Sequence, residues 1–164
     1  MIIKQILIVL SLTGFYACTN YSIDLCIPLH TYKDVQRSNI KDIPNEYLLA
    51  MVAIHECINT CPQDASYIMM ATWNRVLLNY GKYGSLPEQL LSSEFNGLID
   101  KNFYFDSKDK RHVECLKKAK DIITHGPDVR ILGWYSKEAN VKFTASIKNR
   151  VVSLPIKTCH TFWL

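Results

Sequence analysis

The chain has 164 residues, of which 48% are hydrophobic and 21% charged, and it carries a net charge of +4 at pH 7. These values are ordinary for a globular protein, and the length fits one domain with a workable core. The positive charge is not gathered into a stripe, which argues against a nucleic-acid partner but is compatible with another anionic polymer. The sequence holds no internal repeat and no low-complexity tract.

The first 18 residues have the layout of a bacterial export signal. Lys4 precedes an apolar run over residues 6–12, which is too short to span a bilayer. We therefore expect residues 1–17 to be a signal peptide. Ala17-Cys18 also fits a lipoprotein processing site, at which Cys18 would be lipidated and attach the protein to a membrane. Plain cleavage is the alternative, and an uncleaved apolar helix is a weaker one.

Export would bring the other cysteines into an oxidising compartment, where disulfides form. Five remain besides Cys18, namely Cys26, Cys57, Cys61, Cys115 and Cys159. This odd number leaves at least one thiol free or paired between chains. One or two disulfides fit the count, and the spacing does not assign their pairs.

Residues 18–44 become polar along their length, and we expect them to be a tether with at most one short packed turn. The domain is then expected to span residues 45–164. It opens with two apolar helices, one over residues 46–59 and one that starts after Pro62 and carries apolar residues as far as Leu77. Helices that are apolar nearly all round belong in a core, so this pair predicts a buried hairpin.

Further helices and then strands are predicted along the chain. Residues 85–91 predict a short capped helix, and residues 109–125 predict an amphipathic helix ended by Gly126-Pro127. Four short segments rich in β-branched and aromatic residues follow, at 131–135, 141–145, 150–154 and 156–163. They predict two to four antiparallel strands. The order predicts an α+β fold, mainly helical in its N-terminal part with a small antiparallel sheet towards the C-terminus.

Glu56 is the candidate catalytic residue in this buried hairpin. It lies near the C-terminal end of the first helix, beside His55. Partial burial and the negative end of the helix dipole both favour a protonated carboxyl group. A carboxylic acid that stays protonated near neutral pH is what a general acid needs.

Metal and cofactor chemistry has less support. A zinc-protease motif would need a second histidine four residues after His55, and that position is Asn59. The remaining cysteines and histidines show no compact zinc spacing, and there is no Gly-rich phosphate loop. We therefore expect no metal and no cofactor, and keep an exported metal-binding protein as the weakest alternative.

A series of short motifs follows Glu56 in order. They are Thr-Trp-Asn-Arg-Val at 72–76, Leu-Pro at 86–87, Leu-Leu at 90–91, Phe-Asn-Gly at 95–97, Gly-Pro-Asp at 126–128, Trp-Tyr at 134–135 and Ile-Lys-Thr-Cys-His-Thr-Phe-Trp at 156–163. Their order and spacing resemble the spore cortex-lytic, or cell wall hydrolase, family of peptidoglycan-degrading enzymes. The resemblance covers residues 46–163.

This resemblance implies a lysozyme-like fold and lytic transglycosylase activity on the glycan strand, with Glu56 at the position of the family's catalytic glutamate. Three positions depart from the family pattern. Residues 57–60 are Cys-Ile-Asn-Thr where the family has an Ala- and Gly-containing run. Glu94 stands where a Gln is usual, and Cys159 where an Asn is common.

We therefore predict an exported cell wall hydrolase whose partner is peptidoglycan. It would be held in the cell envelope or secreted, and either a bacterium or a phage would encode it. Glu56 would protonate the glycosidic oxygen between N-acetylmuramic acid and N-acetylglucosamine, and Glu94 would be a second carboxylate if water attacks. The predicted substrate-binding residues are Asn74, Glu94, Phe95, Tyr135 and His160. The alternatives are that Asn74, Arg75 and His160 are structural, and that the chain is an inactive glycan-binding protein on the same scaffold.

Overall fold

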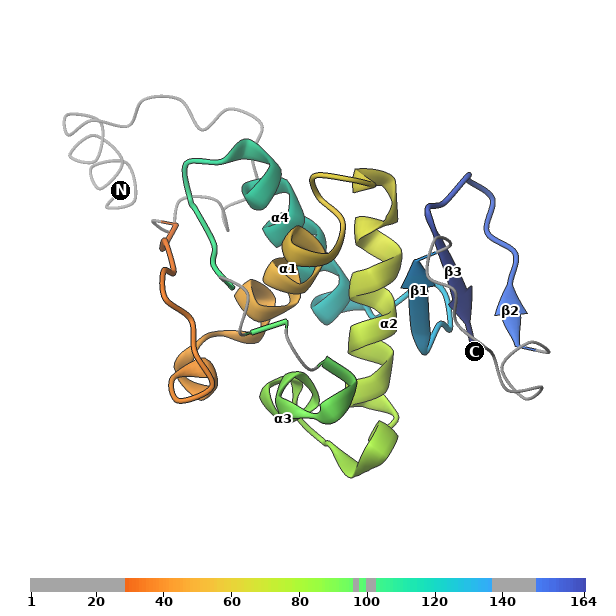
Figure 1. Ribbon diagram of the computed structural model, residues 1–164, viewed down its shortest axis with the longest axis horizontal. Helices are drawn as coiled ribbons and strands as arrows, with labels where there is room; N and C mark the ends of the chain where they lie inside the picture. The colour runs from red at the N-terminus through yellow and green to blue at the C-terminus, as the bar shows by residue number, and fades with distance from the viewer. Residues whose placement is uncertain (1–28, 96–97, 100–102, 137–149) are drawn as a thin grey trace, which may run out of the picture.

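The computed structural model describes residues 29–95, 98–99, 103–136 and 150–164 (Figure 1). The predicted signal peptide, Cys18, Cys26 and the predicted strand at 141–145 lie outside the described residues. Within them, four α-helices and a three-stranded antiparallel sheet form the α+β fold expected from the sequence. Their bounds are α1 Asn45–Glu56, α2 Ala65–Leu77, α3 Leu86–Leu91, α4 Lys110–His125, β1 Gly133–Ser136, β2 Val151–Val152 and β3 His160–Trp163.

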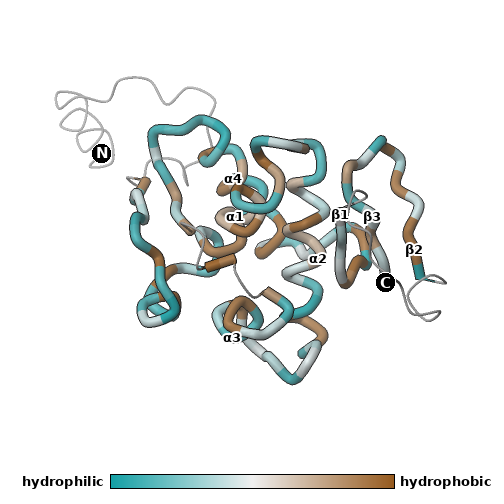
Figure 2. Tube along the Cα trace, viewed as in Figure 1, coloured by the Kyte–Doolittle hydropathy of each residue, from teal (hydrophilic) through white to brown (hydrophobic). Residues whose placement is uncertain are grey.

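The helix α1 is the centre of the core. Every residue from Tyr47 to Ile54 is buried, and α1 packs against both α2 and α4. The hydropathy colouring in Figure 2 shows apolar residues gathered along α1 and the facing parts of its neighbours. The predicted hairpin of α1 and α2 is confirmed. However, α1 ends at Glu56 rather than at Asn59, because Cys57 leaves helical geometry with φ −146° and starts a turn.

The other two predicted helices are also confirmed, and local capping explains where they begin. Asp109 caps α4 by accepting a hydrogen bond from the backbone N–H of Arg111 at 2.8 Å. Gly126 ends the same helix with φ +85°, a conformation that favours glycine. Ser85 caps α3 through its hydroxyl, which accepts from the backbone N–H of Glu88 at 3.4 Å.

Residues 29–44 differ from the predicted tether, because they are packed on the domain. Val35, Ile40 and Ile43 are buried, and burial of each such side chain is worth about 1.5–3 kcal/mol. Tyr32 and Phe105 exchange two backbone hydrogen bonds of 2.9 and 2.8 Å. The domain therefore begins before residue 45. The sequence obscures this because the three apolar residues are scattered among charged ones.

The three strands lie on the far side of α2 from α1 and α4 (Figure 1). Their order is β1-β3-β2, so β3 is central and pairs antiparallel with both neighbours. Trp134 of β1 and Val152 of β2 both stand opposite Phe162 of β3. Among the described residues, no helix has the length and apolar character that a membrane crossing requires.

Candidate active site

Glu56 is the last residue of α1, and its carboxyl group reaches the first strand of the sheet. Its side chain is half-buried, and its Oε2 accepts a hydrogen bond from the indole Nε1 of Trp134 at 3.4 Å. The two residues are 78 positions apart. Glu56 thus stands where the end of the most buried helix meets the first strand. A carboxyl group in this position has an aromatic donor on one side and remains partly open to solvent.

Trp134 in turn belongs to a group of aromatic rings around Arg75. The ring of Phe95 meets that of Trp134 edge-on, with centroids 5.9 Å apart. The guanidinium carbon of Arg75 lies 5.4 Å from the Phe95 centroid and 5.9 Å from the Trp134 centroid. Phe95 was predicted to bind substrate, and the structure places it, buried, beside the indole that contacts Glu56.

Glu94 is held by the same arginine. Its Oε2 accepts from Nη1 of Arg75 at 2.5 Å, and the exposed fraction of the side chain is 44% for Glu94 but 8% for Arg75. Burial lowers the pKa of Arg75, and the charge of Glu94 partly offsets that effect. Arginine nevertheless remains charged at neutral pH. Glu94 is therefore engaged in an ion pair with one open side, rather than standing free beside Glu56.

Asn74 has a structural position. It is buried, and its side-chain nitrogen donates to the carbonyls of Val129 and Ile131 at 2.9 and 3.1 Å. Arg75 adds a hydrogen bond from Nε to the carbonyl of Leu132. These bonds fasten the segment that leads into β1 to α2. The contacts agree with the alternative that Asn74 buttresses the fold, since both hydrogens of its amide serve backbone groups.

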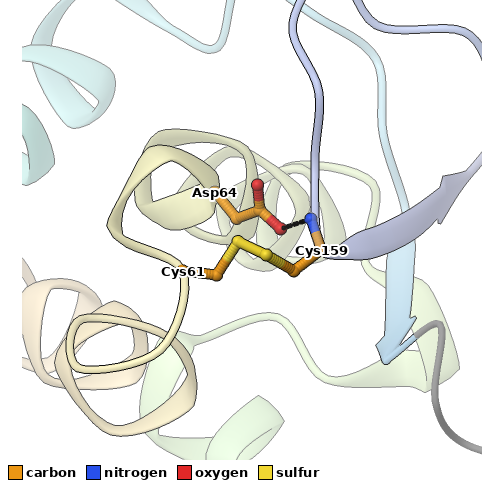
Figure 3. Close-up of side chains that lie close together, drawn as sticks. All are labelled: Cys61, Asp64 and Cys159. Atoms are coloured by element: carbon orange, nitrogen blue, oxygen red, sulfur yellow. Dashed lines mark hydrogen bonds between the residues drawn. A yellow bond between two sulfur atoms is a disulfide. The ribbon is translucent and has the colours of Figure 1, made fainter.

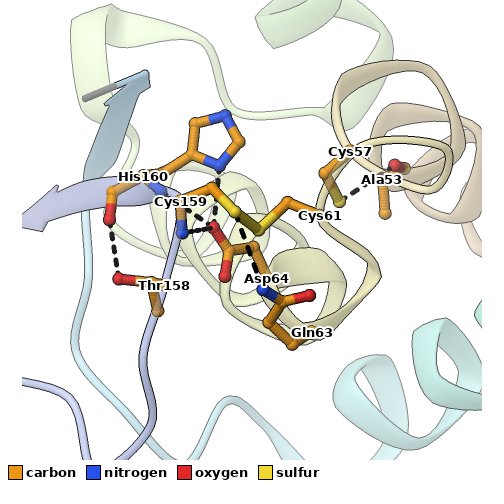
Figure 4. The surroundings of a disulfide bond; sticks show 8 residues. All are labelled: Ala53, Cys57, Cys61, Gln63, Asp64, Thr158, Cys159 and His160. Atoms are coloured by element: carbon orange, nitrogen blue, oxygen red, sulfur yellow. Dashed lines mark hydrogen bonds and ion pairs between the residues drawn. A yellow bond between two sulfur atoms is a disulfide. The ribbon is translucent and has the colours of Figure 1, made fainter. Parts of the chain in front are cut away.

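His160 is buried and pairs with Asp64, which the sequence did not single out (Figure 4). The Oδ2 of Asp64 lies 2.8 Å from Nδ1 of His160 and accepts the backbone N–H groups of Cys159 and His160, each at 2.9 Å. Asp64 is fully buried at the start of α2. Its carboxylate therefore anchors the beginning of β3. His160 has the contacts of a satisfied core histidine, which is the structural alternative given above.

A disulfide between Cys61 and Cys159 reinforces this anchor (Figure 3). It joins the turn after α1 to the residue before β3. Cys61, Cys159 and Asp64 lie close enough together to suggest a metal site, but the disulfide occupies both sulfur atoms. Metal-binding cysteines act as thiolates, so these three residues offer no such ligand set while the bond is intact.

Within the described part of the chain, Cys57 and Cys115 are free and buried. Burial raises the pKa of Cys57 to about 12 and that of Cys115 to about 11. Both therefore remain protonated thiols at neutral pH. A buried thiol of this kind packs as a small apolar side chain and is a poor nucleophile.

Tyr135 and one cavity of the structure lie apart from the contacts of Glu56. Tyr135 follows Trp134 in β1, so its side chain is directed to the opposite face of the sheet. A cavity of about 380 Å³ is lined by β2, β3 and the segment that connects them, and its lining includes Lys157, His160 and Phe162. Glu56 is not among its lining residues. Of the predicted site residues, the structure thus brings Glu56, Glu94 and Phe95 to one place, around Trp134 and Arg75.

Sequence reasoning missed Trp134 and Asp64 as site residues. Trp134 was visible within the Trp-Tyr motif, yet nothing local links it to a glutamate 78 residues away. Asp64 directly precedes α2, where an acidic residue reads as an ordinary helix start. Comparison with known protein families, curated proteins and solved structures found no match for this chain.

Proposed function

We propose that the protein is a glycosidase that cleaves the glycan strand of peptidoglycan, with Glu56 as its general acid. The observation that carries the proposal is the pairing of Glu56 with Trp134, beside Phe95. A partly buried carboxyl group can protonate a glycosidic oxygen, and aromatic rings beside it offer faces against which a sugar can pack. The ordered motifs that resemble the cell wall hydrolase family support the same reading. They also favour a lysozyme-like variant of the α+β fold.

The proposed reaction needs one carboxyl group acting twice. Protonated Glu56 donates its proton to the oxygen between N-acetylmuramic acid and N-acetylglucosamine as the bond from that oxygen to the muramic C1 breaks. The resulting carboxylate then takes the proton of the 6-hydroxyl of the same muramic acid, and O6 bonds to C1. The products are a shortened glycan with a free 4-hydroxyl and a 1,6-anhydro sugar, and Glu56 is protonated again.

The engagement of Glu94 favours this one-carboxylate route over hydrolysis. A hydrolase of the inverting type needs a second carboxylate that activates water. Glu94 is the carboxylate predicted for that role, and its Oε2 is committed to Arg75 at 2.5 Å. A carboxylate held in this ion pair is not free to turn towards a water molecule at the sugar. We therefore propose anhydro ends rather than reducing ends as the products.

The place of action follows from the substrate. Peptidoglycan lies outside the cytoplasmic membrane, so the protein must be exported to act on it. The predicted signal at residues 1–17 would provide export, and lipidation of Cys18 would hold the domain at the membrane next to its substrate. The disulfide of Cys61 and Cys159 supports this proposal, because such bonds persist in oxidising compartments.

Digestion of purified peptidoglycan by the protein, followed by mass analysis of the soluble products, tests the proposal. We expect muropeptides with anhydro-muramic ends, each lighter by one water than the hydrolysis product. Products with reducing ends would show that the enzyme hydrolyses the glycan and is not a transglycosylase. No release, with the protein nevertheless sedimenting with the insoluble wall, would overturn the enzymatic proposal in favour of a glycan-binding protein.

A further inference from the structure

The guanidinium of Arg75 lies among four aromatic rings. Its central carbon is 5.2 Å from the ring centroid of Tyr80, 5.4 Å from that of Phe95, and 5.9 Å from those of both Trp134 and Trp163. These rings come from four separate elements of the fold, and Arg75 itself comes from α2. A cation over aromatic faces is attracted by their electron density, and the attraction grows when water is excluded.

The polar groups of Arg75 are fixed as well. Its Nε donates to the carbonyl of Leu132, two residues before Trp134, and its Nη1 donates to Glu94. The side chain is only 8% exposed. Arg75 therefore holds Trp134 in two ways, through the face of the indole and through the backbone that carries it. The edge of the same indole carries the N–H that binds Glu56.

We propose that Arg75 is a positioning residue, which orients the indole of Trp134 so that its N–H reaches the carboxyl group of Glu56. This inference rests on the proposed function of Glu56 as the acid. Arg75 does not itself touch Glu56 through any hydrogen bond or ion pair found among the described residues. It acts by setting the angle of the group that does.

The shape of the guanidinium explains why an arginine stands here. It is planar, so it can lie against rings with its faces while its edge donates to Leu132 and Glu94. A lysine ammonium would keep the positive charge but would lose both the stacking surface and the paired donors. Arg75→Lys is therefore the variant that separates charge from geometry. Arg130, which is exposed, supplies the matched control Arg130→Lys.

A merely structural Arg75 would lower the stability of the protein without changing the contact between Trp134 and Glu56. The indole N–H resonance of Trp134 in a ¹⁵N NMR spectrum of the full chain reports that contact directly. The chain has three tryptophans, so the resonance can be assigned with Trp134→Phe. When Glu56→Gln is the only substitution, this resonance should move from its wild-type position.

We expect Arg75→Lys to move the Trp134 resonance and to abolish its response to Glu56→Gln, while Arg130→Lys does neither. A Trp134 resonance unchanged in Arg75→Lys would overturn the proposal. If Arg75→Lys does not fold, Glu94→Gln is the second variant, because Glu94 is 44% exposed and its loss frees only Nη1 of Arg75. Glu94→Gln should move the Trp134 resonance away from its wild-type position, and no shift would equally overturn the proposal.

Kinetics on peptidoglycan provide the second arm. A displaced catalytic group costs about 10- to 100-fold in kcat, so Arg75→Lys should lose that much with little change in KM. In a protein that already carries Trp134→Phe, adding Arg75→Lys should lower kcat by less than about twofold, because the indole through which Arg75 acts is absent. If the kcat losses of Arg75→Lys and Trp134→Phe multiply in the double variant, the two residues act independently and the proposal is overturned. The NMR experiment needs no substrate. A wild-type protein without activity would therefore refute the proposed function but not the positioning role of Arg75.

Discussion

Removal of the Cys61–Cys159 disulfide should cost much of the stability of this domain. The bond joins residues that are 98 positions apart. In the chain-entropy model, closing a loop of this length in the unfolded chain is worth about 4–5 kcal/mol. A domain of this kind is stable by only about 5–15 kcal/mol, so the double variant Cys61→Ala/Cys159→Ala should lose from about a third to most of that stability.

Urea unfolding followed by tryptophan fluorescence measures this loss. We expect the double variant to be less stable than the wild type by about 4 kcal/mol, and the wild type in dithiothreitol to fall by a similar amount. The internal control is that dithiothreitol should leave the double variant unchanged. A loss below about 1 kcal/mol would refute the reasoning, because the crosslink would then not restrict the unfolded chain.

Three further predictions concern buried polar groups and thiols. Asp64→Ala removes the acceptor of three hydrogen bonds, of which the two from His160 are buried, and should cost at least about 3 kcal/mol in urea unfolding. A loss under about 1 kcal/mol would contradict the anchoring role. Burial lowers the pKa of His112, so the unfolded chain takes up a proton as the pH falls below about 6.5, whereas the folded protein does so only at a lower pH. The free energy of unfolding should therefore fall between about pH 7 and pH 5, and it should fall less steeply in His112→Gln than in the wild type. An equal dependence on pH in the two proteins would count against this prediction. Cys57 and Cys115 have pKa values of about 12 and 11, so neither thiol should react with a thiol reagent at about pH 8 until urea is added. Peptide mass mapping can locate the labelled cysteines. Rapid labelling of either cysteine in the native protein would contradict this prediction.

Most of the helical structure could be predicted because its signals are local. The apolar run of α1, the Asp109 cap and the Gly126 stop all lie within a few residues of the feature they determine. The small antiparallel sheet was foreseen from composition in the same way. The packed segment before residue 45 was not, because Val35, Ile40 and Ile43 have no regular spacing and depend on a surface formed by distant residues.

The candidate site was foreseen only in part, for a related reason. The position of Glu56 at the end of a buried helix is a local property, and it could be read from the sequence. Its partner Trp134 and the disulfide of Cys61 depend on how the sheet docks against α2, which no local pattern records. The aromatic surroundings of Arg75 combine four distant segments, so the sequence could suggest a structural role for this arginine but not its geometry.

The neutralisation of Glu56 is the most direct test of the account. Glu56→Gln keeps the size of the side chain and its ability to accept from Trp134 but cannot donate a carboxyl proton. Glu114→Gln, on the exposed face of α4, is the matched control. General acid catalysis contributes about 10²- to 10⁴-fold, so Glu56→Gln should slow the release of muropeptides from peptidoglycan by at least about 100-fold while Glu114→Gln does not. Release by Glu56→Gln at the wild-type rate would contradict the account.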